Sequence, residues 1–265
     1  MKPFLKWAGG KRWLTRQLAD HLPATFNRYF EPFLGSAAVY FELAPANAIL
    51  SDANDALINT YCAIRAYPAE IHERLAQLHA LHSRDLYYKQ RALRTNDPIE
   101  AATRFIYLNR TCWNGLYRVN QKNEFNVPIG TKDTVLFPDD DFKLIAKALT
   151  GAEINTGDFE ISINRALEGD LIYVDPPYTV KHNFNGFLKY NQVMFSWDDQ
   201  VRLHDCLVRA RCRGCHIVIS NADHHSIREL YSDFDDMISL SRASIIAGKS
   251  SARSSTTELL VVHNG

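Results

Sequence analysis

Two short apolar segments, each ending in an aspartate, constrain the fold of this chain more than any other feature. Residues 48–52 and 170–175 have the composition of buried strands, and they finish at Asp52 and Asp175. Segments with helical periodicity lie between them. Strands that alternate with helices predict an α/β fold, with an open, mostly parallel sheet and helices on both faces. Ligands of such sheets bind beyond the carboxyl ends of the strands, which makes both aspartates candidate binding residues.

The remaining elements follow from the same periodicity and from breaks at proline and glycine. Helices are expected at 14–22, 37–43, 55–66, 68–82, 198–213 and 227–231, and further strands at 29–33, 152–155, 216–220 and 258–263. Residues 84–150 differ from the rest, because polar helices there give way to a loop rich in aromatic residues, Asn and Gly.

Composition places the chain among ordinary soluble globular proteins. Of its 265 residues, 46% are hydrophobic and 23% are charged. No apolar run approaches the roughly 20 residues that span a bilayer, and residues 1–6 lack the apolar core of a secretory signal. The odd cysteine count of five favours reduced thiols and a cytoplasmic location. We expect no metal, because the Cys-x-x-Cys pair at 212–215 has no second pair at zinc spacing, and a monomer, because no exposed apolar stripe stands out.

The most specific chemical signal is the run Asp175, Pro176, Pro177 and Tyr178, directly after an apolar strand. Two prolines fix the backbone and remove two N–H donors, so the turn presents carbonyl acceptors and one carboxylate beside an aromatic ring. Such a turn suits an exocyclic amine on a flat ring. The carboxylate and the Pro176 carbonyl can accept the two amine hydrogens while Tyr178 stacks on the ring. The alternative interpretation is a strand-terminating turn with a solvated aspartate.

A second signal lies at Gly35, between the strand expected at 29–33 and the next helix. A glycine there lets the backbone approach a ligand closely. Asp52 lies seventeen residues further on, at a strand end where an acid can bind ribose hydroxyls. Positions 35–40 lack the Gly-x-Gly-x-x-Gly pattern that cradles pyrophosphate, so a nucleoside without phosphates fits better. A simple tight turn is the alternative.

Residues 4–12 place Trp7 and two glycines next to Lys11 and Arg12. This pattern favours an exposed loop with an aromatic platform and cations, which could cover a ligand or touch phosphates. A tethered basic terminus explains the segment equally well.

A loop between residues 109 and 130 interleaves Arg, Asn and aromatic side chains around the turn signal Asn114–Gly115. Arg is the preferred bidentate partner of guanine, Asn pairs with adenine, and an apolar or aromatic wedge can part a base step. The pattern therefore favours a β-hairpin that reads nucleic acid. An ordinary hairpin with a polar face is the alternative.

The net charge is zero, with 30 Lys and Arg against 30 Asp and Glu, which at first argues against a nucleic-acid partner. The distribution of charge argues the other way. Residues 1–16, 104–132 and 242–253 carry net charges of +5, +4 and +3. Neutrality thus reflects segregation of charge, and Lys249 and Arg253 in the last segment are expected to contact phosphates.

Taken together and in this order, the motifs resemble the Dam family of DNA adenine-N6 methyltransferases, over nearly the whole chain. The matching runs are Leu-Lys-Trp-Ala-Gly-Gly-Lys from Leu5, Glu-Pro-Phe-x-Gly from Glu31, Asp-x-Asn from Asp52, Tyr-Leu-Asn-Arg from Tyr107, Asn-Gly-Leu-x-Arg-x-Asn from Asn114, Glu-Phe-Asn-Val-Pro-x-Gly from Glu124, Asp-Pro-Pro-Tyr from Asp175 and Phe-x-x-Tyr from Phe187.

This resemblance implies a Rossmann-like fold that binds S-adenosylmethionine and carries a helical and β-hairpin target-recognition insert. Residues 57–150 would form the insert, and residues 1–56 and 151–265 the catalytic domain. It also implies site-specific methylation of adenine N6 in double-stranded DNA, by base flipping and within GATC.

The resemblance further implies roles for individual residues, by motif match. Catalysis falls to Asp175, Pro176, Pro177 and Tyr178. S-adenosylmethionine is expected to contact Trp7, Lys11, Glu31, Phe33, Gly35, Asp52, Asp158, Phe159 and Asp175. DNA is expected to contact Lys6, Arg110, Trp113, Asn114, Leu116, Arg118, Asn120, Lys132, Phe187, Tyr190, Lys249 and Arg253, with Trp113 at the intercalating position.

The chain departs from the family pattern at three places. Ala37 stands where a second glycine is expected, Thr131 and Lys132 stand where close relatives carry an Arg, and 181–186 lacks the usual Ser/Thr pattern. Three other functions stay open: a cytosine-N4 methyltransferase, an RNA- or glutamine-modifying methyltransferase of the same fold, and a DNA-binding regulator without catalysis.

Overall fold

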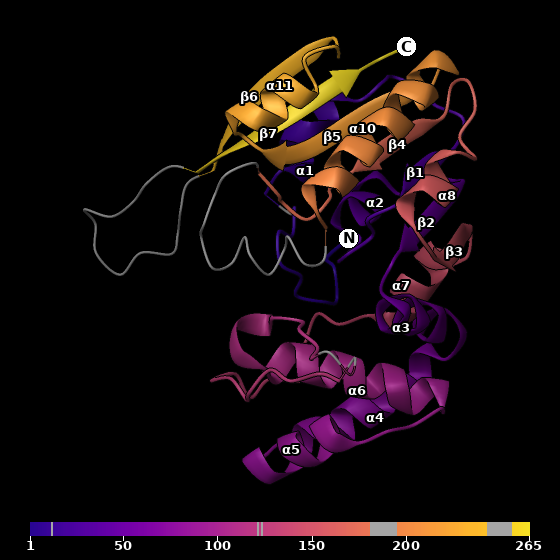
Figure 1. The fold of residues 1–265 in the computed structure, drawn as a ribbon. Helices are drawn as coiled ribbons and strands as arrows, with labels where there is room; N and C mark the ends of the chain where they lie inside the picture. The colour runs from indigo at the N-terminus through magenta and orange to yellow at the C-terminus, as the bar shows by residue number, and fades with distance from the viewer. Residues whose placement is uncertain (12, 121, 123, 181–194, 243–255) are drawn as a thin grey trace. The chain divides into compact units, whose positions relative to one another are not determined.

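The computed structural model describes residues 1–11, 13–120, 122, 124–180, 195–242 and 256–265 (Figure 1). Its helices are α1 (Thr15–Leu18), η1 (Ala19–His21), α2 (Ala38–Leu43), α3 (Asp55–Ala66), α4 (Pro68–Ala80), α5 (Arg84–Ala92), α6 (Pro98–Thr111), η2 (Trp113–Gly115), α7 (Phe142–Leu149), α8 (Phe159–Ile163), α10 (Trp197–Cys212) and α11 (His225–Leu230). Its strands are β1 (Tyr29–Glu31), β2 (Ala48–Asp52), β3 (Ala152–Thr156), β4 (Leu171–Val174), β5 (His216–Ala222), β6 (Asp236–Arg242) and β7 (Thr256–His263).

The strands of the described residues form one sheet in the order β3-β2-β1-β4-β5-β7-β6. β1 pairs in parallel with β2 and β4, and β4 pairs in parallel with β5. β7 runs antiparallel to both β5 and β6. This confirms the predicted α/β class. β6 and α8 were not anticipated from the sequence. β6 lies at the end of the strand order, and its residues 236–241 are exposed or half-buried, so its sequence lacks a buried apolar run.

The register of β1 determines where the strand ends fall. Tyr29 pairs with Ala48 of β2 and with Leu171 of β4. Because all three strands run in parallel from this row, their carboxyl ends reach the same edge of the sheet. That edge is where an α/β sheet binds its ligands.

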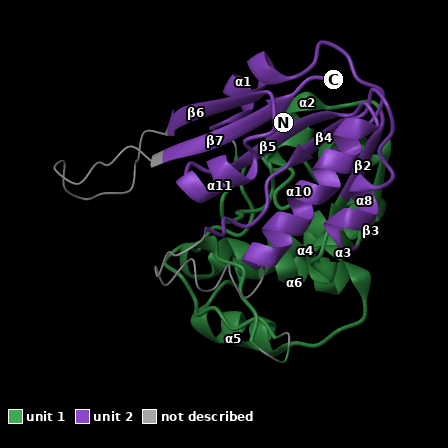
Figure 2. Ribbon diagram, turned by 45° about the horizontal axis from the view of Figure 1, so that its top comes forward, with its two compact units in different colours: residues 1–12, 34–46, 51–156 green, residues 13–33, 47–50, 157–265 purple. Residues whose placement is uncertain are grey.

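The chain divides into two compact units, drawn in two colours in Figure 2. The first unit comprises residues 1–12, 34–46 and 51–156, and the second comprises residues 13–33, 47–50 and 157–265. The whole of the expected recognition domain, 57–150, falls within the first unit.

The core of the second unit forms where α8 and α10 cover one face of the sheet (Figure 1). Helix α10 begins with a capping box, in which the Asp199 N–H donates to Ser196 Oγ (3.1 Å) and the Ser196 N–H donates to Asp199 Oδ2 (2.9 Å). The helix then buries one apolar stripe against alternate residues of the strands. This core includes Ile163, Ile172, Val174, Leu203, Leu207, Ala210, Ile217, Ile219, Leu259 and Val261.

Helices α3 to α7 make up most of the first unit, and side chains that cap their first turns mark where α3 and α6 begin. Asn54 Oδ1 accepts the N–H of Leu57 (3.1 Å) at the start of α3. Asp97 accepts two N–H groups at the start of α6, where Pro98 occupies the first helical position. The buried side of α6 includes Ile106 and Leu108.

A buried ion pair ties the amino-terminal segment into the first unit. The Arg110 guanidinium, 1% exposed, pairs with Asp140, whose side chain is 8% exposed. The same guanidinium donates to the carbonyl of Phe4 (2.8 Å) and to that of Val135 (2.7 Å). Arg110 therefore joins α6, the segment before α7 and the start of the chain.

Replacing Asp140 with Ala should remove the countercharge and strand a buried guanidinium. We expect Asp140→Ala to lower the free energy of unfolding by about 3–5 kcal/mol, measured by urea denaturation. The matched control is Asp139→Ala, because Asp139 pairs with Lys2 (2.6 Å) on the surface, where both side chains are about half exposed. The control should lose far less. Equal losses in the two variants would contradict a special role for the buried pair.

Candidate functional site

The turn after β4 carries the four predicted catalytic residues in the second unit. Asp175 follows the strand directly and is partly buried, Pro176 is buried, and Tyr178 is partly buried. The Tyr178 hydroxyl lies 3.5 Å from Ser220 Oγ at the end of β5. Burial, and next the charge of Asp175, raises the pKa of Tyr178 far above its ordinary value. Tyr178 therefore stays a neutral phenol at physiological pH and offers an uncharged ring.

Aromatic side chains form a cluster near the ends of β1 and the start of α8. The Phe33 ring stacks on the Phe159 ring at 5.4 Å between centroids, and Phe195 packs edge-on against Phe33 at 5.6 Å. Phe33 is partly buried and Phe159 is buried. On β1, Glu31 is buried and accepts the hydroxyl hydrogen of Tyr29 (2.9 Å).

Asp158 is an exposed carboxylate that caps α8 by accepting the N–H of Glu160 (2.9 Å). Arg202 of α10 holds it in a two-pronged pair at 2.7 and 2.9 Å. This hydrogen bond lowers the pKa of Asp158. The Arg202 guanidinium also lies over the Phe159 ring, 4.1 Å from the centroid. Arg202 therefore fixes both Asp158 and Phe159, two residues predicted to contact the cofactor.

In the first unit, Asp52 and Gly35 contact each other directly. Asp52 accepts the N–H of Gly35 (3.0 Å) through one oxygen and the N–H of Asn54 (3.0 Å) through the other. Burial raises the pKa of Asp52, although these backbone hydrogen bonds act in the opposite direction. The Gly35 carbonyl in turn accepts the hydroxyl hydrogen of Tyr61 (3.0 Å). The tight turn at Gly35 is thus fixed on both sides.

Trp7 and Lys11 lie in the same unit. The Trp7 ring stacks on Tyr117 at 5.6 Å and on Phe105 at 6.4 Å between centroids. Lys11 is buried, and its Nζ donates to the Gly9 carbonyl (2.9 Å). A tryptophan stacked on two rings is a fixed platform rather than a loose terminal side chain.

The predicted turn at Asn114–Gly115 is present, and both residues have positive φ, 55° and 66°. The Leu116 N–H closes the turn on the Trp113 carbonyl (3.2 Å). The hairpin is looser than expected: among the described residues it consists of two isolated bridges, Cys112–Ile129 and Val119–Phe125. Trp113 is 50% exposed, which leaves an indole ring open to a partner.

The polar residues of the hairpin are held by partners within it. Arg118 is exposed, and its Nε donates to Asn126 Oδ1 (2.8 Å). Asn120 donates through Nδ2 to Glu124 (3.0 Å). These bonds orient the side chains without burying them.

Lys6 lies beside the turn. Its backbone N–H donates to Asn109 Oδ1 (2.8 Å), and its Nζ donates to the Arg110 carbonyl (3.3 Å). Partial burial of its ammonium group lowers the pKa of Lys6. A Cβ added to Gly115 would come within 2.7 Å of the Lys6 side chain, because that side chain packs directly against the glycine of the turn. Lys132 is exposed.

Arg110 is the one described residue of the expected DNA set that the structure places elsewhere. Its guanidinium is buried and engaged by Asp140 and two carbonyls, so it is not available to a phosphate. The expected contacts Phe187, Tyr190, Lys249 and Arg253 lie outside the described residues.

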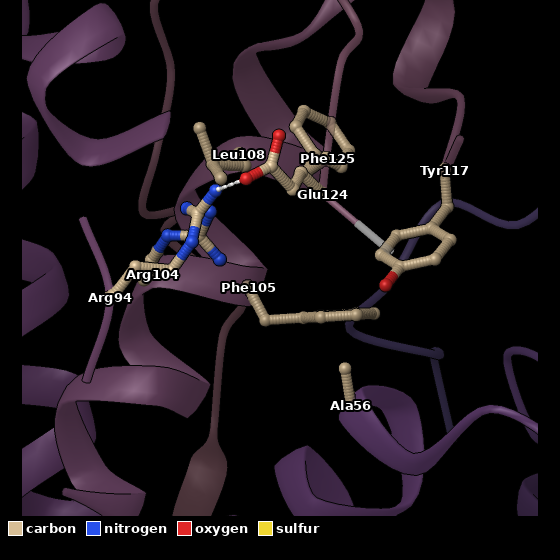
Figure 3. Close-up of a pocket in the computed structure, with 8 residues that line it drawn as sticks. All are labelled: Ala56, Arg94, Arg104, Phe105, Leu108, Tyr117, Glu124 and Phe125. Atoms are coloured by element: carbon tan, nitrogen blue, oxygen red, sulfur yellow. Dashed lines mark hydrogen bonds and ion pairs between the residues drawn. The ribbon is translucent and has the colours of Figure 1, made fainter. Parts of the chain in front are cut away.

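A cavity of about 130 Å³ lies between α6 and the hairpin (Figure 3). An ion pair of Arg94 with Glu124 (2.8 Å) lies at its side, and Arg104 donates to the carbonyls of Gln90 and Arg91. Its lining is Ala56, Arg94, Arg104, Phe105, Leu108, Tyr117, Glu124 and Phe125. Aromatic rings therefore connect α6 to the hairpin and brace its position within the first unit.

Sequence reasoning missed Arg202, Phe195 and Ser220. Each is separated by at least 42 residues from the side chain it supports, and none belongs to a motif. The partial signal is the capping pattern at Ser196–Asp199, which places the first turn of α10 and hence Arg202.

The comparisons with known proteins identify the class. The family described as D12 class N6 adenine-specific DNA methyltransferase matches residues 7–245, and the chain belongs to it. The type II methyltransferase M1.LlaDCHI of Lactococcus lactis is 36% identical, covering 100% of this chain and 96% of that protein. DNA adenine methylases of Haemophilus influenzae (34% identical) and Vibrio cholerae (33%) each cover 87% of this chain, and 83% and 84% of their own lengths.

The chain is therefore a site-specific DNA methyltransferase that modifies N6 of adenine, with a Rossmann-like fold and a methyl donor as its second substrate. This confirms the family and activity expected from the motifs. Within the described ranges no helix is long and apolar enough to cross a membrane, and no group of three or more His, Cys, Asp or Glu could hold a metal ion.

Ala37, one of the three departures from the family pattern, adopts φ 55° and ψ 31° and is fully buried. This left-handed conformation is one that glycine adopts without strain. Gly35, two residues earlier, has φ 48°, and a Cβ there would lie 2.8 Å from Trp7 Cδ1. Position 35 therefore requires glycine, whereas position 37 holds an alanine in a backbone conformation that favours glycine.

We expect opposite effects from exchanging glycine and alanine at these positions. Gly35→Ala should lower the free energy of unfolding by at least about 1 kcal/mol and shift the fluorescence of Trp7. Ala37→Gly should raise it by up to about 1 kcal/mol, since relief of strain exceeds the added freedom of the unfolded chain. Gly157→Ala is the control, because its Cβ would meet Ile161 at an ordinary 3.8 Å. Changes of the same sign at 35 and 37 would refute this account.

Proposed function

We propose that the enzyme takes its methyl group from S-adenosylmethionine and transfers it to adenine N6 in GATC, after flipping the base out of the duplex. The observation that carries the proposal is the Asp175–Tyr178 turn directly after β4, with the Tyr178 hydroxyl anchored beside β5. A flipped base needs a flat ring and fixed acceptors, and this turn offers both.

The described residues fit S-adenosylmethionine in chemical kind. The Phe33–Phe159 stack suits the adenine ring of the cofactor, and Asp52 suits its ribose hydroxyls. The cofactor residues that we propose are Trp7, Lys11, Glu31, Phe33, Gly35, Asp52, Asp158, Phe159 and Asp175. When bound, this cofactor supplies an electrophilic methyl group.

The enzyme's own residues act on the target amine. Asp175 and the Pro176 carbonyl accept the two N6 hydrogens, and Tyr178 stacks on the base. An aromatic amine is a poor nucleophile because its lone pair is delocalised into the ring. Acceptors held off the ring plane favour the pyramidal amine and localise the lone pair. Positioning and stabilisation of developing positive charge then account for most of the acceleration, without a covalent enzyme–base intermediate.

The exposed face of the hairpin supports DNA reading. Trp113 can fill the space left by the flipped base, and Arg118, oriented by Asn126, suits a guanine edge. The DNA contacts that we propose are Lys6, Trp113, Asn114, Leu116, Arg118, Asn120, Lys132, Phe187, Tyr190, Lys249 and Arg253; Arg110 is left out because of its burial. We further propose a cytoplasmic enzyme that acts as a monomer.

Asp175→Ala should lower methyl transfer by at least about 10³-fold, because the amine loses its charged acceptor. Binding of S-adenosylmethionine, measured by calorimetry, should stay largely intact. Asp198→Ala removes an exposed carboxylate of the same unit and should leave turnover unchanged. Tritium transfer to duplexes labelled in adenine or in cytosine measures the rate and the methylated base. Retained turnover in Asp175→Ala would sink the mechanism, and label on cytosine would contradict the target.

Two variants should distinguish a residue that reads a base from one that binds a phosphate. Arg118→Ala should reduce discrimination between GATC and sites with one changed base by about 1–3 kcal/mol, measured as a ratio of kcat/KM. Lys132→Ala should weaken binding to all duplexes alike and reduce the slope of log K against log salt concentration by about 1.

Plasmid from an expressing strain should resist a nuclease that GATC methylation blocks; complete cutting would refute the GATC assignment.

A further inference from the structure

A row of buried polar side chains lies on the face of the sheet opposite α10. Side chains alternate between the two faces of a strand, and Ile219 of β5 and Leu259 of β7 belong to the core beneath α10. Ser220 of β5 and Glu258 of β7 therefore face the other way. The two strands are neighbours, with Ala222 paired to Glu258 and Ser220 paired to Leu260, so Ser220 and Glu258 are diagonal neighbours on this face.

Glu258 is a carboxylate in an unexpected place. It is only 9% exposed, and Ser220 beside it is 1% exposed. Burying a carboxylate is unfavourable unless donors satisfy it. The reaction as described above makes no use of this group.

The Tyr178 hydroxyl lies beside Ser220 Oγ, and it interacts with the neighbouring Glu258 carboxylate as well. The distance to Ser220 Oγ is 3.5 Å, at the limit of a hydrogen bond, so this partner is weak. A hydrogen bond to a carboxylate is roughly twice as strong as one between neutral groups. Glu258 is thus a second, charged neighbour for the end of the Tyr178 side chain, beside Ser220.

We infer that Glu258 is a positioning residue for the methyl transfer, because its carboxylate fixes the Tyr178 ring against which the target adenine stacks. The inference rests on the proposed role of Tyr178. The two prolines before Tyr178 fix the backbone of the turn, but the tilt of the ring depends on its two side-chain torsions. Holding the hydroxyl removes that freedom, so the adenine amine is presented to Asp175 at a constant angle.

A positioning role for Glu258 predicts that its loss affects the chemical step and not binding. Loss of Glu258 should leave the cofactor site and duplex binding intact, and it should slow the chemical step, since misplacement by about 1 Å can cost on the order of 10²-fold. A purely structural role would lower stability and cofactor affinity as well, and it would not depend on the Tyr178 hydroxyl.

A double-mutant cycle tests this coupling. Glu258→Leu should reduce single-turnover methyl transfer by about 10–100-fold with unchanged Kd for S-adenosylhomocysteine. Glu258→Gln keeps an acceptor and should restore most of the rate, which also covers the case in which the Leu variant fails to fold. In a Tyr178→Phe background the hydroxyl is absent, so Glu258→Leu should add less than about a twofold further loss. Glu229→Leu, an exposed glutamate in the same unit, is the control.

The outcomes separate this inference from the proposed function. Fully additive losses at Glu258 and Tyr178, or full activity in Glu258→Leu, would overturn the positioning role. If Tyr178→Ala keeps full activity, then the proposed stacking on Tyr178 is wrong, and the positioning role falls with it. If Tyr178→Ala abolishes transfer while the cycle is additive, then the stacking stands and Glu258 acts elsewhere.

Discussion

The parallel pairing of β1 with both β2 and β4 is the constraint on which the chemistry depends. One row of the register, Tyr29 with Ala48 and Leu171, brings three carboxyl ends to one edge of the sheet. The strands are mostly apolar, and the acids they carry are Glu31 at the end of β1 and Asp52 at the end of β2. β2 ends at Asp52 and Asp175 follows β4 directly, so each aspartate is held by the end of a strand. A side chain held on a strand end keeps its geometry better than one on a free loop.

The acids of the candidate site are held in different ways, and the difference suits different tasks. Asp52 accepts two backbone N–H groups, yet burial dominates and raises its pKa. Asp158 is gripped by Arg202, which lowers its pKa and keeps it charged. A carboxylate held only by backbone N–H groups can still offer lone pairs to ribose hydroxyls. One clamped by an arginine is fixed in position, and the same Arg202 guanidinium lies over the Phe159 ring beside it.

The sequence predicts the residues at strand ends and turns, because local patterns determine them. An apolar run that stops at an acid indicates Asp175, and Asn114–Gly115 indicates a turn with positive φ, which the structure confirms. It does not predict partners made by folding. Arg202 on α10 contacts Asp158 and Phe159 of the neighbouring helix α8, and Glu258 on β7 interacts with Tyr178 of the turn after β4. β6 is an edge strand whose residues 236–241 are exposed or half-buried. Arg110 shows the reverse error: a cation inside a basic motif looks like a phosphate contact until its burial is known.

Burial also changes what the charge pattern means for DNA. The segment 104–132 has a net charge of +4, but Arg104 donates to two backbone carbonyls and Arg110 is paired inside the first unit. The cations of this segment that remain exposed include Arg118, Lys122 and Lys132. Because each neutralised phosphate contributes about one unit of salt slope, the segment supports a weaker salt dependence than its sequence charge implies. In the proposed complex, affinity for the target site then depends more on fixed geometry at the hairpin, where the turn follows Trp113 and Asn126 orients Arg118.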